Sequence, residues 1–184
     1  MHGLGALVLV YFVFPTNFFV VAPKEYVLLA VLAAVLVLEA LRHAGAVELP
    51  TIRPYEEHRV ASFVYYAVAL AGAVLLLPIP IAAAVVLGTA LVDPIAGGLR
   101  ASVRYRPYYP GVPFAVYVGL AFIGLGPFGG WPIGWALVLT IPAAVVALAA
   151  EYPKYPWVDD DLVMTFAPAL VLYAAGVLAL GLPT

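Results

Sequence analysis

The residues best suited to chemistry are carboxylates that lie in or beside apolar segments. Asp93 interrupts a long apolar run, and three adjacent acids, Asp159, Asp160 and Asp161, directly precede another. A carboxylate in a membrane helix costs about 2.5–3.5 kcal/mol on insertion scales, so it needs a partner or a function. Three adjacent carboxylates also repel one another, which a bound Mg²⁺ would relieve. We therefore predict a metal site formed by these four residues; capping of the following helix remains the alternative for the triplet, and we expect one of the three acids to act as a cap.

Three arginines follow Asp93 closely. Helical spacing places Asp93, Gly97, Arg100 and Arg104 on one face, and a glycine lets a ligand or another helix approach the backbone. The planar guanidinium groups of Arg100, Arg104 and Arg106 are suited to gripping phosphates. Two structural alternatives stay open, an Asp93–Arg100 pair with glycines for helix packing and a basic anchor at the membrane surface.

Glu39 and Arg42 form a second charged pair, three residues apart near the end of an apolar run. Such a pair is often only a surface ion pair, although the apolar surroundings of Glu39 favour a functional role. The chain has no cysteine, which excludes disulfides, thiolate metal sites and a cysteine nucleophile. Its three histidines lack metal-binding spacing, and no Walker loop, Rossmann glycine pattern or nucleophile elbow is present.

Composition indicates the environment in which these groups act. The 184 residues are 66% hydrophobic and only 10% charged, with a mean hydropathy of +1.10. A soluble domain needs more charge to cover its surface, so the excess apolar surface must face lipid. The net charge of −2 gives no basic field for nucleic acid. A single asparagine and no glutamine suggest a thermophile.

Seven apolar stretches approach the roughly 20 residues that a membrane-spanning helix needs. Helices satisfy their own backbone groups in hydrocarbon, so we predict an all-α, polytopic bundle forming one integral membrane domain over residues 1–184. Pro15, Pro142 and Pro168 should kink their helices unless a neighbour satisfies the freed carbonyl. The predicted spans are 3–21, 26–41, 60–77, 79–99, 112–125, 131–150 and 162–182.

Charge is distributed unevenly between the two sides of this predicted bundle. Three longer connections, 42–59, 100–111 and 151–161, share a side with the N-terminus and hold Arg42, Arg53, Arg59, Arg100, Arg104, Arg106 and Lys154. Only Lys24 lies on the other side. The positive-inside rule makes the charged side cytoplasmic and places the C-terminus outside. Every acid except Glu25 gathers there too, so we expect one active site at the cytoplasmic side of the cell membrane.

Short motifs occur in a recognisable order along nearly the whole chain. They are His2-Gly3, the E-x-x-R helix end at 38–42, the acidic lead at 56–59 followed by Ser62 and Tyr65, the stretch 92–96, and Glu151 followed by 159–162. Together they resemble the dolichol kinase and phytol kinase family, membrane enzymes related to phosphatidate cytidylyltransferases. The stretch 92–96 is similar to the family's G-D-x-x-A nucleotide motif at Asp93 and Ala96. Three features depart from it: Val92 replaces glycine, the Lys-Ser after this helix is missing, and Asp161 stands where asparagine is common.

The resemblance implies Mg²⁺-assisted phosphoryl transfer from a nucleoside triphosphate, typically CTP, to an isoprenoid alcohol such as a polyprenol. Such a reaction needs positioning and charge neutralisation more than covalent chemistry. In this interpretation Glu39 orients or deprotonates the lipid hydroxyl, and the lipid enters between helices along the face of Gly97 and Gly98. Asp93 and the acidic triplet hold Mg²⁺ on the phosphates. The nucleotide-binding residues are Arg42, Arg59, Gly97, Arg100, Arg104 and Arg106.

Two other functions remain open at this point. Cytidylyl transfer from CTP to a lipid phosphate would use nearly the same residues and give a CDP-lipid. A non-enzymatic transporter or lipid-binding scaffold would instead place charged residues along a path across the bilayer. The outer half of the predicted bundle is almost bare of charge, which favours an enzyme.

Overall fold

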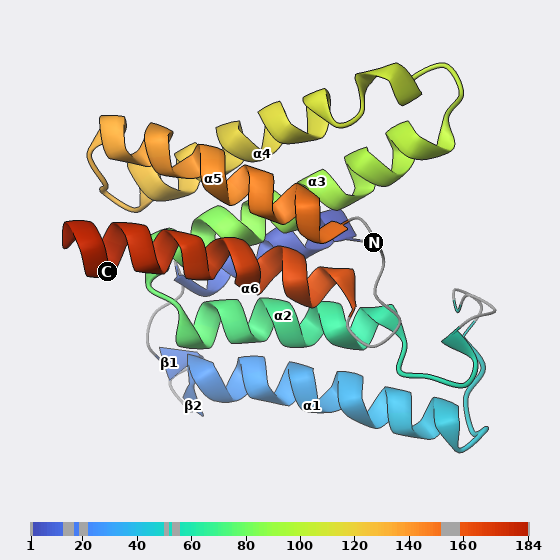
Figure 1. The fold of residues 1–184 in the computed structure, drawn as a ribbon. Coiled ribbons are helices and arrows are strands. Elements are labelled where there is room, and N and C mark those ends of the chain that lie inside the picture. Colours follow the sequence, from blue (N-terminus) through green and yellow to red (C-terminus); the bar gives the residue numbers. More distant parts are fainter. Residues whose placement is uncertain are drawn as a thin grey trace.

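Helices that run alternately in opposite directions make up nearly all of the structure (Figure 1). The structure is a computed structural model, and it describes residues 2–12, 17–18, 22–49, 52, 56–151 and 159–183. The bounds of the helices are η1 His2–Phe12, α1 Lys24–His43, α2 Ser62–Leu76, α3 Ile79–Ala101, α4 Gly111–Ile123 with its continuation η4 Gly124–Phe128, α5 Ile133–Glu151, and α6 Asp160–Leu172 with its continuation η5 Tyr173–Ala179. A 3₁₀ turn, η3 Arg106–Tyr108, lies between α3 and α4. The described part of the chain therefore confirms the all-α class and the seven helical segments.

Four helical segments are long and apolar enough to cross a membrane. They are Ile79–Ala101, Gly111–Phe128, Ile133–Glu151 and Asp160–Ala179. Helix α2, Ser62–Leu76, is equally apolar but shorter. These lengths match the thickness of a bilayer core, as expected of a multi-pass membrane protein.

The first segment differs from its predicted helix over 3–21. A 3₁₀ helix ends at Phe12, and the strands β1 Asn17–Phe18 and β2 Ala22–Pro23 then pair in antiparallel register. An antiparallel ladder directs backbone hydrogen bonds between strands, so these residues cannot continue a helix toward Val21. Pro15 lies outside the described residues.

Helix α3 occupies the centre of the bundle, in contact with η1, α2, α4 and α6. Close approach depends on small residues, as is common between membrane helices. A Cβ added at Gly124 would lie 2.5 Å from the backbone nitrogen of Ala84, and one at Gly88 would lie 2.4 Å from Cε2 of Tyr117. The register between α3 and η4 and between α3 and α4 is therefore fixed by glycines.

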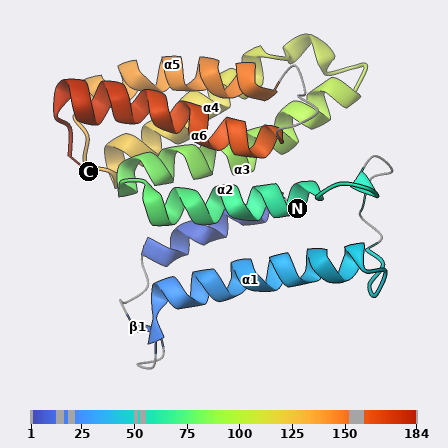
Figure 2. The ribbon, with the colours of Figure 1, turned by 60° about the horizontal axis from the view of Figure 1, so that its bottom comes forward.

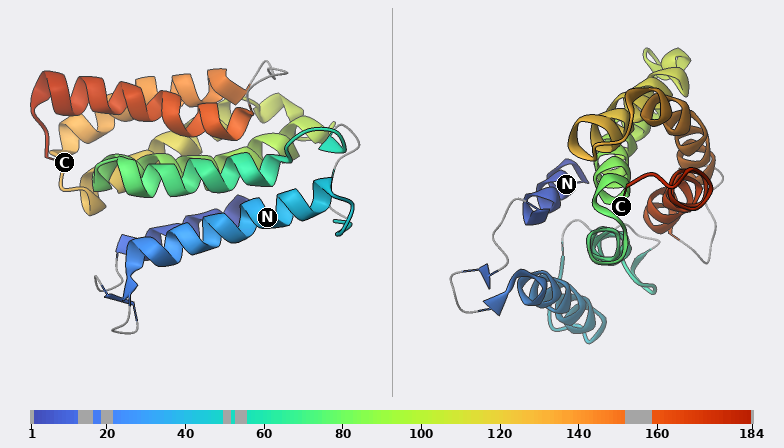
Figure 3. Two further views of the ribbon diagram at one scale, coloured as in Figure 1. Left: turned by 90° about the horizontal axis from the view of Figure 1, so that it is seen from below. Right: turned by 90° about the vertical axis from the view of Figure 1, so that its left-hand side faces the viewer.

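Helix α1 lies at the edge of the bundle, with α2 between it and α6 (Figures 2 and 3). Glu39 is its one buried residue. Its exposed apolar side chains include Tyr26, Val27, Leu29, Val31, Leu36, Val37 and Leu41. In a membrane protein this surface faces lipid.

Prolines lie inside three helices without ending them. Pro94, Pro142 and Pro168 are within α3, α5 and α6. Pro168 has no N–H for the carbonyl of Met164, and the hydroxyl of Thr89 on α3 donates to that carbonyl at 3.3 Å. A neighbouring helix thus satisfies the freed carbonyl, which is one of the two outcomes predicted for this proline.

Candidate site at the polar end of the bundle

Because successive helices run in opposite directions, the end of one helix and the start of the next lie at the same end of the molecule. Here the last turns of α1, α3 and α5 lie near the first turns of α2 and α6 (Figure 1). We call this the polar end, because it carries Glu39, Asp93, Arg100, Glu151 and the acids that open α6. Arg53 and Lys154, which contribute to the predicted charge asymmetry, lie outside the described residues.

The opposite end carries a small charged group at the start of α1. The hydroxyl of Tyr11 donates to Oε1 of Glu25 at 2.9 Å, and Nζ of Lys24 donates to the backbone carbonyl of Tyr11 at 3.2 Å. The ammonium also lies 4.5 Å from the centre of the Tyr11 ring. These contacts join η1 to α1, so Lys24 and Glu25 have a structural use of their own.

Carboxylates from α3 and α6 come together at the polar end. Asp161 is 4% exposed, and its carboxyl group lies within electrostatic range of Asp93, Asp159 and Asp160. Tyr66 of α2 lies within range of both Asp93 and Asp161. Residues of α2 and α3, which are consecutive in the chain, therefore lie near Asp161 of α6, and Asp93 is close enough to the acidic triplet for its charge to act on Asp161.

Asp159 is the helix cap expected within the triplet. Its backbone is extended (φ −73°, ψ 140°), and its carboxylate accepts a hydrogen bond from the backbone N–H of Asp161 at 3.1 Å. Burial, together with the nearby charge of Asp160, raises the pKa of Asp159. The hydroxyl of Ser62 lies beside this carboxylate and also donates to Oε1 of Glu56. Asp159 therefore links α6 to the beginning of α2.

Glu39 and Arg42 form a buried pair that organises the connection between α1 and α2. Nε and Nη2 of Arg42 donate to the two oxygens of Glu39 at 2.8 and 2.7 Å, and the N–H of Ala61 donates to Oε1 at 2.9 Å. Arg42 also donates to the backbone carbonyls of Glu56 at 3.2 Å and Arg59 at 2.8 Å. Both side chains are 8% exposed, so this is not the surface ion pair considered from sequence. Hydrogen bonds to both oxygens of Glu39 suit a positioning role better than proton abstraction.

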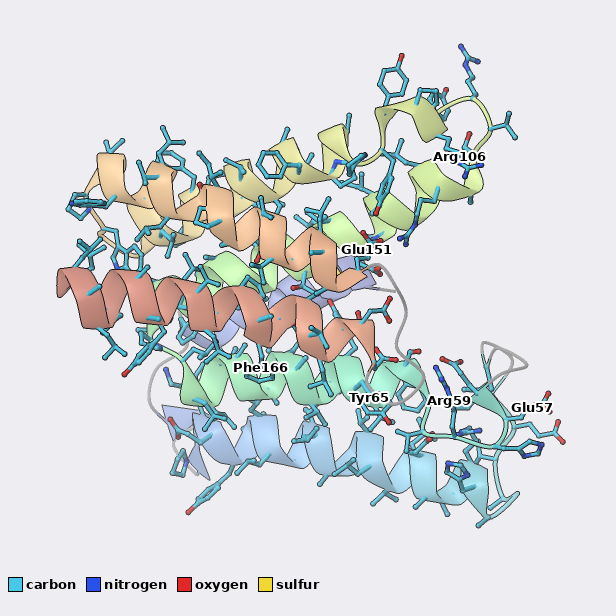
Figure 4. All side chains as sticks on the ribbon, in the orientation of Figure 1. Glu57, Arg59, Tyr65, Arg106, Glu151 and Phe166 are labelled. Carbon is cyan, nitrogen blue, oxygen red and sulfur yellow. The ribbon has the colours of Figure 1, made fainter. Side chains whose placement is uncertain are left out.

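Arg100 forms an ion pair with Glu151 at the end of α5. Glu151 is fully buried, and the guanidinium of Arg100 also lies 5.4 Å from the ring centre of Tyr109. The pair joins α3 to the end of α5, where Glu151 lies near the beginning of α6 (Figure 4). Glu151 belonged to the closing sequence motif, and the structure adds it to the candidate site as the partner of an arginine.

The other two arginines of this group do not share the face of Asp93. Helix α3 ends at Ala101 and Ser102 is extended, so the prediction that Arg104 continues the helical face is wrong. Its guanidinium lies 5.5 Å from the ring centre of Tyr105. Arg106 projects from the tip of the connection between α3 and α4, away from the beginning of α2 (Figure 4). Both side chains are exposed.

Two further predicted features are open to their surroundings. A Cβ at Gly97 or Gly98 would have no neighbour within 4 Å among the described residues. Arg59 is exposed in the connection that Arg42 anchors, next to Glu57 (Figure 4). Among the described residues, no side chain covers the glycine positions of this face of α3.

The acids fit a divalent cation only as a partial set of ligands. Among the described residues, no three histidine, aspartate or glutamate side chains are grouped so as to hold a metal ion by themselves. Mg²⁺ prefers oxygen ligands, and it is usually bound by one or two carboxylates with waters and substrate phosphates. Asp93 and Asp161 supply carboxylates of that kind from two helices. A metal ion that is bound together with a nucleotide does not need a complete set of protein ligands.

Comparison with known proteins gives no further assignment. No family model matches the chain, and no curated protein or solved structure matches it significantly. The geometry of the polar end and the motifs of the sequence are therefore the features that point to a function.

Proposed function

We propose that the protein is a membrane transferase that moves a phosphoryl group from CTP to an isoprenoid alcohol, at the cytoplasmic side of the membrane. The observation that carries this proposal is the meeting of Asp93 and Asp161 beside Tyr66 at the charged end of an apolar bundle. The motif order that resembles the dolichol kinase and phytol kinase family supports the reaction class. The excess of arginine in the connections at this end supports the cytoplasmic orientation.

In the proposed reaction the lipid hydroxyl oxygen forms a bond to the γ-phosphorus of CTP. The bond between that phosphorus and the oxygen bridging to the β-phosphate breaks, and CDP leaves with the electron pair. Asp161 or Asp93 accepts the hydroxyl proton, which then passes to water. Mg²⁺ bound by these carboxylates and the phosphates would neutralise the charge on the polyphosphate.

The basic residues have separate tasks in this proposal. Arg100 is already fixed by Glu151, so it offers a positioned positive charge next to the carboxylates. Arg104 and Arg106 are exposed in the connection after α3 and add positive charge to the polar end, which would attract a polyphosphate. Arg42, with Glu39, shapes the connection that carries Arg59. Positive charge and fixed geometry are the main requirements of phosphoryl transfer.

Purified protein incubated with an isoprenoid alcohol, Mg²⁺ and CTP labelled at either the α- or the γ-phosphate tests the reaction. We expect the γ-label, and not the α-label, in the lipid product. Transfer of the α-label to a lipid phosphate would identify cytidylyl transfer instead. Absence of both labels from the lipid, together with transport in liposomes that survives Asp93→Asn, would contradict an enzymatic function.

A further inference from the structure

A cavity lies between η1, α1 and α2, and Tyr66 in its lining is about one turn from the start of α2 at the polar end. Its volume is about 250 Å³, and its walls are formed by Val8, Leu28, Val31, Leu32, Tyr66, Ala67, Leu70 and Ala71. Among the described residues of this lining, Tyr66 supplies the one side-chain polar group. The cavity therefore suits an apolar ligand that carries a single polar end.

Tyr66 connects the cavity to the candidate site. The residue lines the cavity and also lies within electrostatic range of Asp93 and Asp161. It follows Ser62 by four residues on α2, and Ser62 lies beside Asp159. A molecule in the cavity with its polar end at Tyr66 would thus present that end to the carboxylates.

The position of α1 gives an apolar chain a way into the cavity. Leu28, Val31 and Leu32 form the α1 wall, and α1 packs mainly on α2 at the edge of the bundle (Figure 3). Most of the other α1 side chains are exposed and apolar, so lipid surrounds this helix in a membrane. A chain that leaves the cavity past α1 would pass into hydrocarbon rather than into water.

A second cavity of similar volume provides a comparison. It also measures about 250 Å³ and is lined by Leu9, Val10, Phe12, Ile79, Ala83, Leu87 and Phe128. These residues lie toward the end of the bundle opposite the carboxylates, where α3 begins and η4 ends. The described residues that line it carry no polar side chain, so they offer nothing to orient a hydroxyl.

We infer that the cavity between η1, α1 and α2 binds the apolar chain of the lipid alcohol, with the hydroxyl at Tyr66 facing Asp93 and Asp161. The identity of the head group rests on the proposed function, whereas the chain site rests on the cavity itself. This route replaces the glycine face of α3, leaving Gly97 and Gly98 for the nucleotide. The two substrates would then approach the carboxylates from different helices.

Photo-crosslinking in the full-length protein tests the chain site directly. The probe is geranylgeraniol with a diazirine near the hydroxyl end of its chain, and labelled peptides are identified by mass spectrometry. We expect labels within 28–32 of α1 and 67–71 of α2, and competition by unlabelled geranylgeraniol. Leu32→Trp, on the lipid-facing helix, should reduce labelling severalfold, and Ala67→Phe should do so from the α2 side.

Leu87→Trp, which fills the second cavity, is the matched control and should leave this labelling unchanged. Labels around Leu87 and Phe128, or undiminished labelling in both Leu32→Trp and Ala67→Phe, would overturn the inference. Thermal unfolding of each variant shows that it is folded. Phosphoryl transfer is measured in parallel. Labelling of the cavity without transfer would reject the kinase activity and support the chain site. Transfer without labelling of the cavity would support the kinase activity and reject the chain site.

Discussion

Asp93 of α3 and Asp161 of α6 lie within electrostatic range of each other, although they are far apart in the sequence. Both are in helices that could cross a membrane, where a charge is costly. Two neighbouring carboxylates repel each other, so they are retained together when one is protonated or when a positive charge compensates them. A divalent cation carried by a nucleotide is a partner of that kind, and the predictions below separate it from purely structural uses of the same residues.

Arg42 should be important for stability because its planar guanidinium group donates several hydrogen bonds at once. Arg42→Lys keeps the charge but cannot donate at once to both oxygens of Glu39 and to the carbonyls of Glu56 and Arg59. We expect a lower unfolding temperature, because several of these acceptors lose their donor, measured by thermal unfolding in detergent. Arg104→Lys is the control, because that side chain is exposed. Equal stability of the two variants would show that the buried pair does not organise the α1–α2 connection.

Asp159 should make stability depend on pH in a defined direction. Its pKa is raised in the folded protein above the unfolded value of about 3.9. The folded state therefore binds the proton more tightly, and the stability from this group is greatest at low pH and is lost as pH rises through the folded pKa. Asp159→Asn retains a side chain that can cap the helix but carries no charge. Without metal, the variant should therefore exceed the wild type in stability by more at neutral pH than at about pH 4.

Asp159→Ala separates the cap from the charge. It also removes the buried carboxylate, but it loses the hydrogen bond to the N–H of Asp161, which costs about 1 kcal/mol. Unfolding midpoints of the wild type and both variants, measured at the two pH values, give the comparison. A variant Asp159→Asn that is less stable than the wild type at neutral pH would show that the ionised carboxylate stabilises the fold.

Thr89 should stabilise α6 through the carbonyl that Pro168 leaves without its helical donor. Thr89→Val removes the hydrogen bond to the Met164 carbonyl, and we expect a loss of about 1 kcal/mol. Thr140→Val is the matched control, because the hydroxyl of Thr140 donates to the Leu137 carbonyl within its own helix at 2.7 Å. Unfolding in detergent should rank the Thr89 variant below the control. The reverse order would mean that the freed carbonyl is satisfied in another way.

The sequence predicted the helical architecture and the meeting of the acids because both follow from simple rules. Apolar length defines the helices, and an alternating path brings the end of α3 near the start of α6. The first segment was predicted less well, because hydropathy alone does not distinguish η1 and the β1–β2 pair from one long helix. Arg104 was placed wrongly, since helical spacing has no meaning beyond the end of α3 at Ala101.

Contacts between distant segments could not be read from the sequence. The roles of Glu56, Ser62 and Tyr66 depend on how α2 lies against α6, and the partner of Arg100 is on α5. One signal was present: Ser62 and Tyr66 are four residues apart at the start of an apolar helix, on the same face. The cavity beside Tyr66 left no trace in the sequence, because its walls are ordinary apolar residues of three helices.

The central claim is that Asp93 and Asp161 act together on a metal-bound nucleotide, and calorimetric titration of CTP in the presence and absence of Mg²⁺ tests it most directly. Asp93→Asn and Asp161→Asn should each weaken Mg²⁺-dependent CTP binding by at least about tenfold, since each removes a negatively charged oxygen ligand. Glu57→Gln, at an exposed site, should bind like the wild type, and unfolding curves should show that all three variants are folded. Wild-type, Mg²⁺-dependent affinity in both aspartate variants would contradict the account.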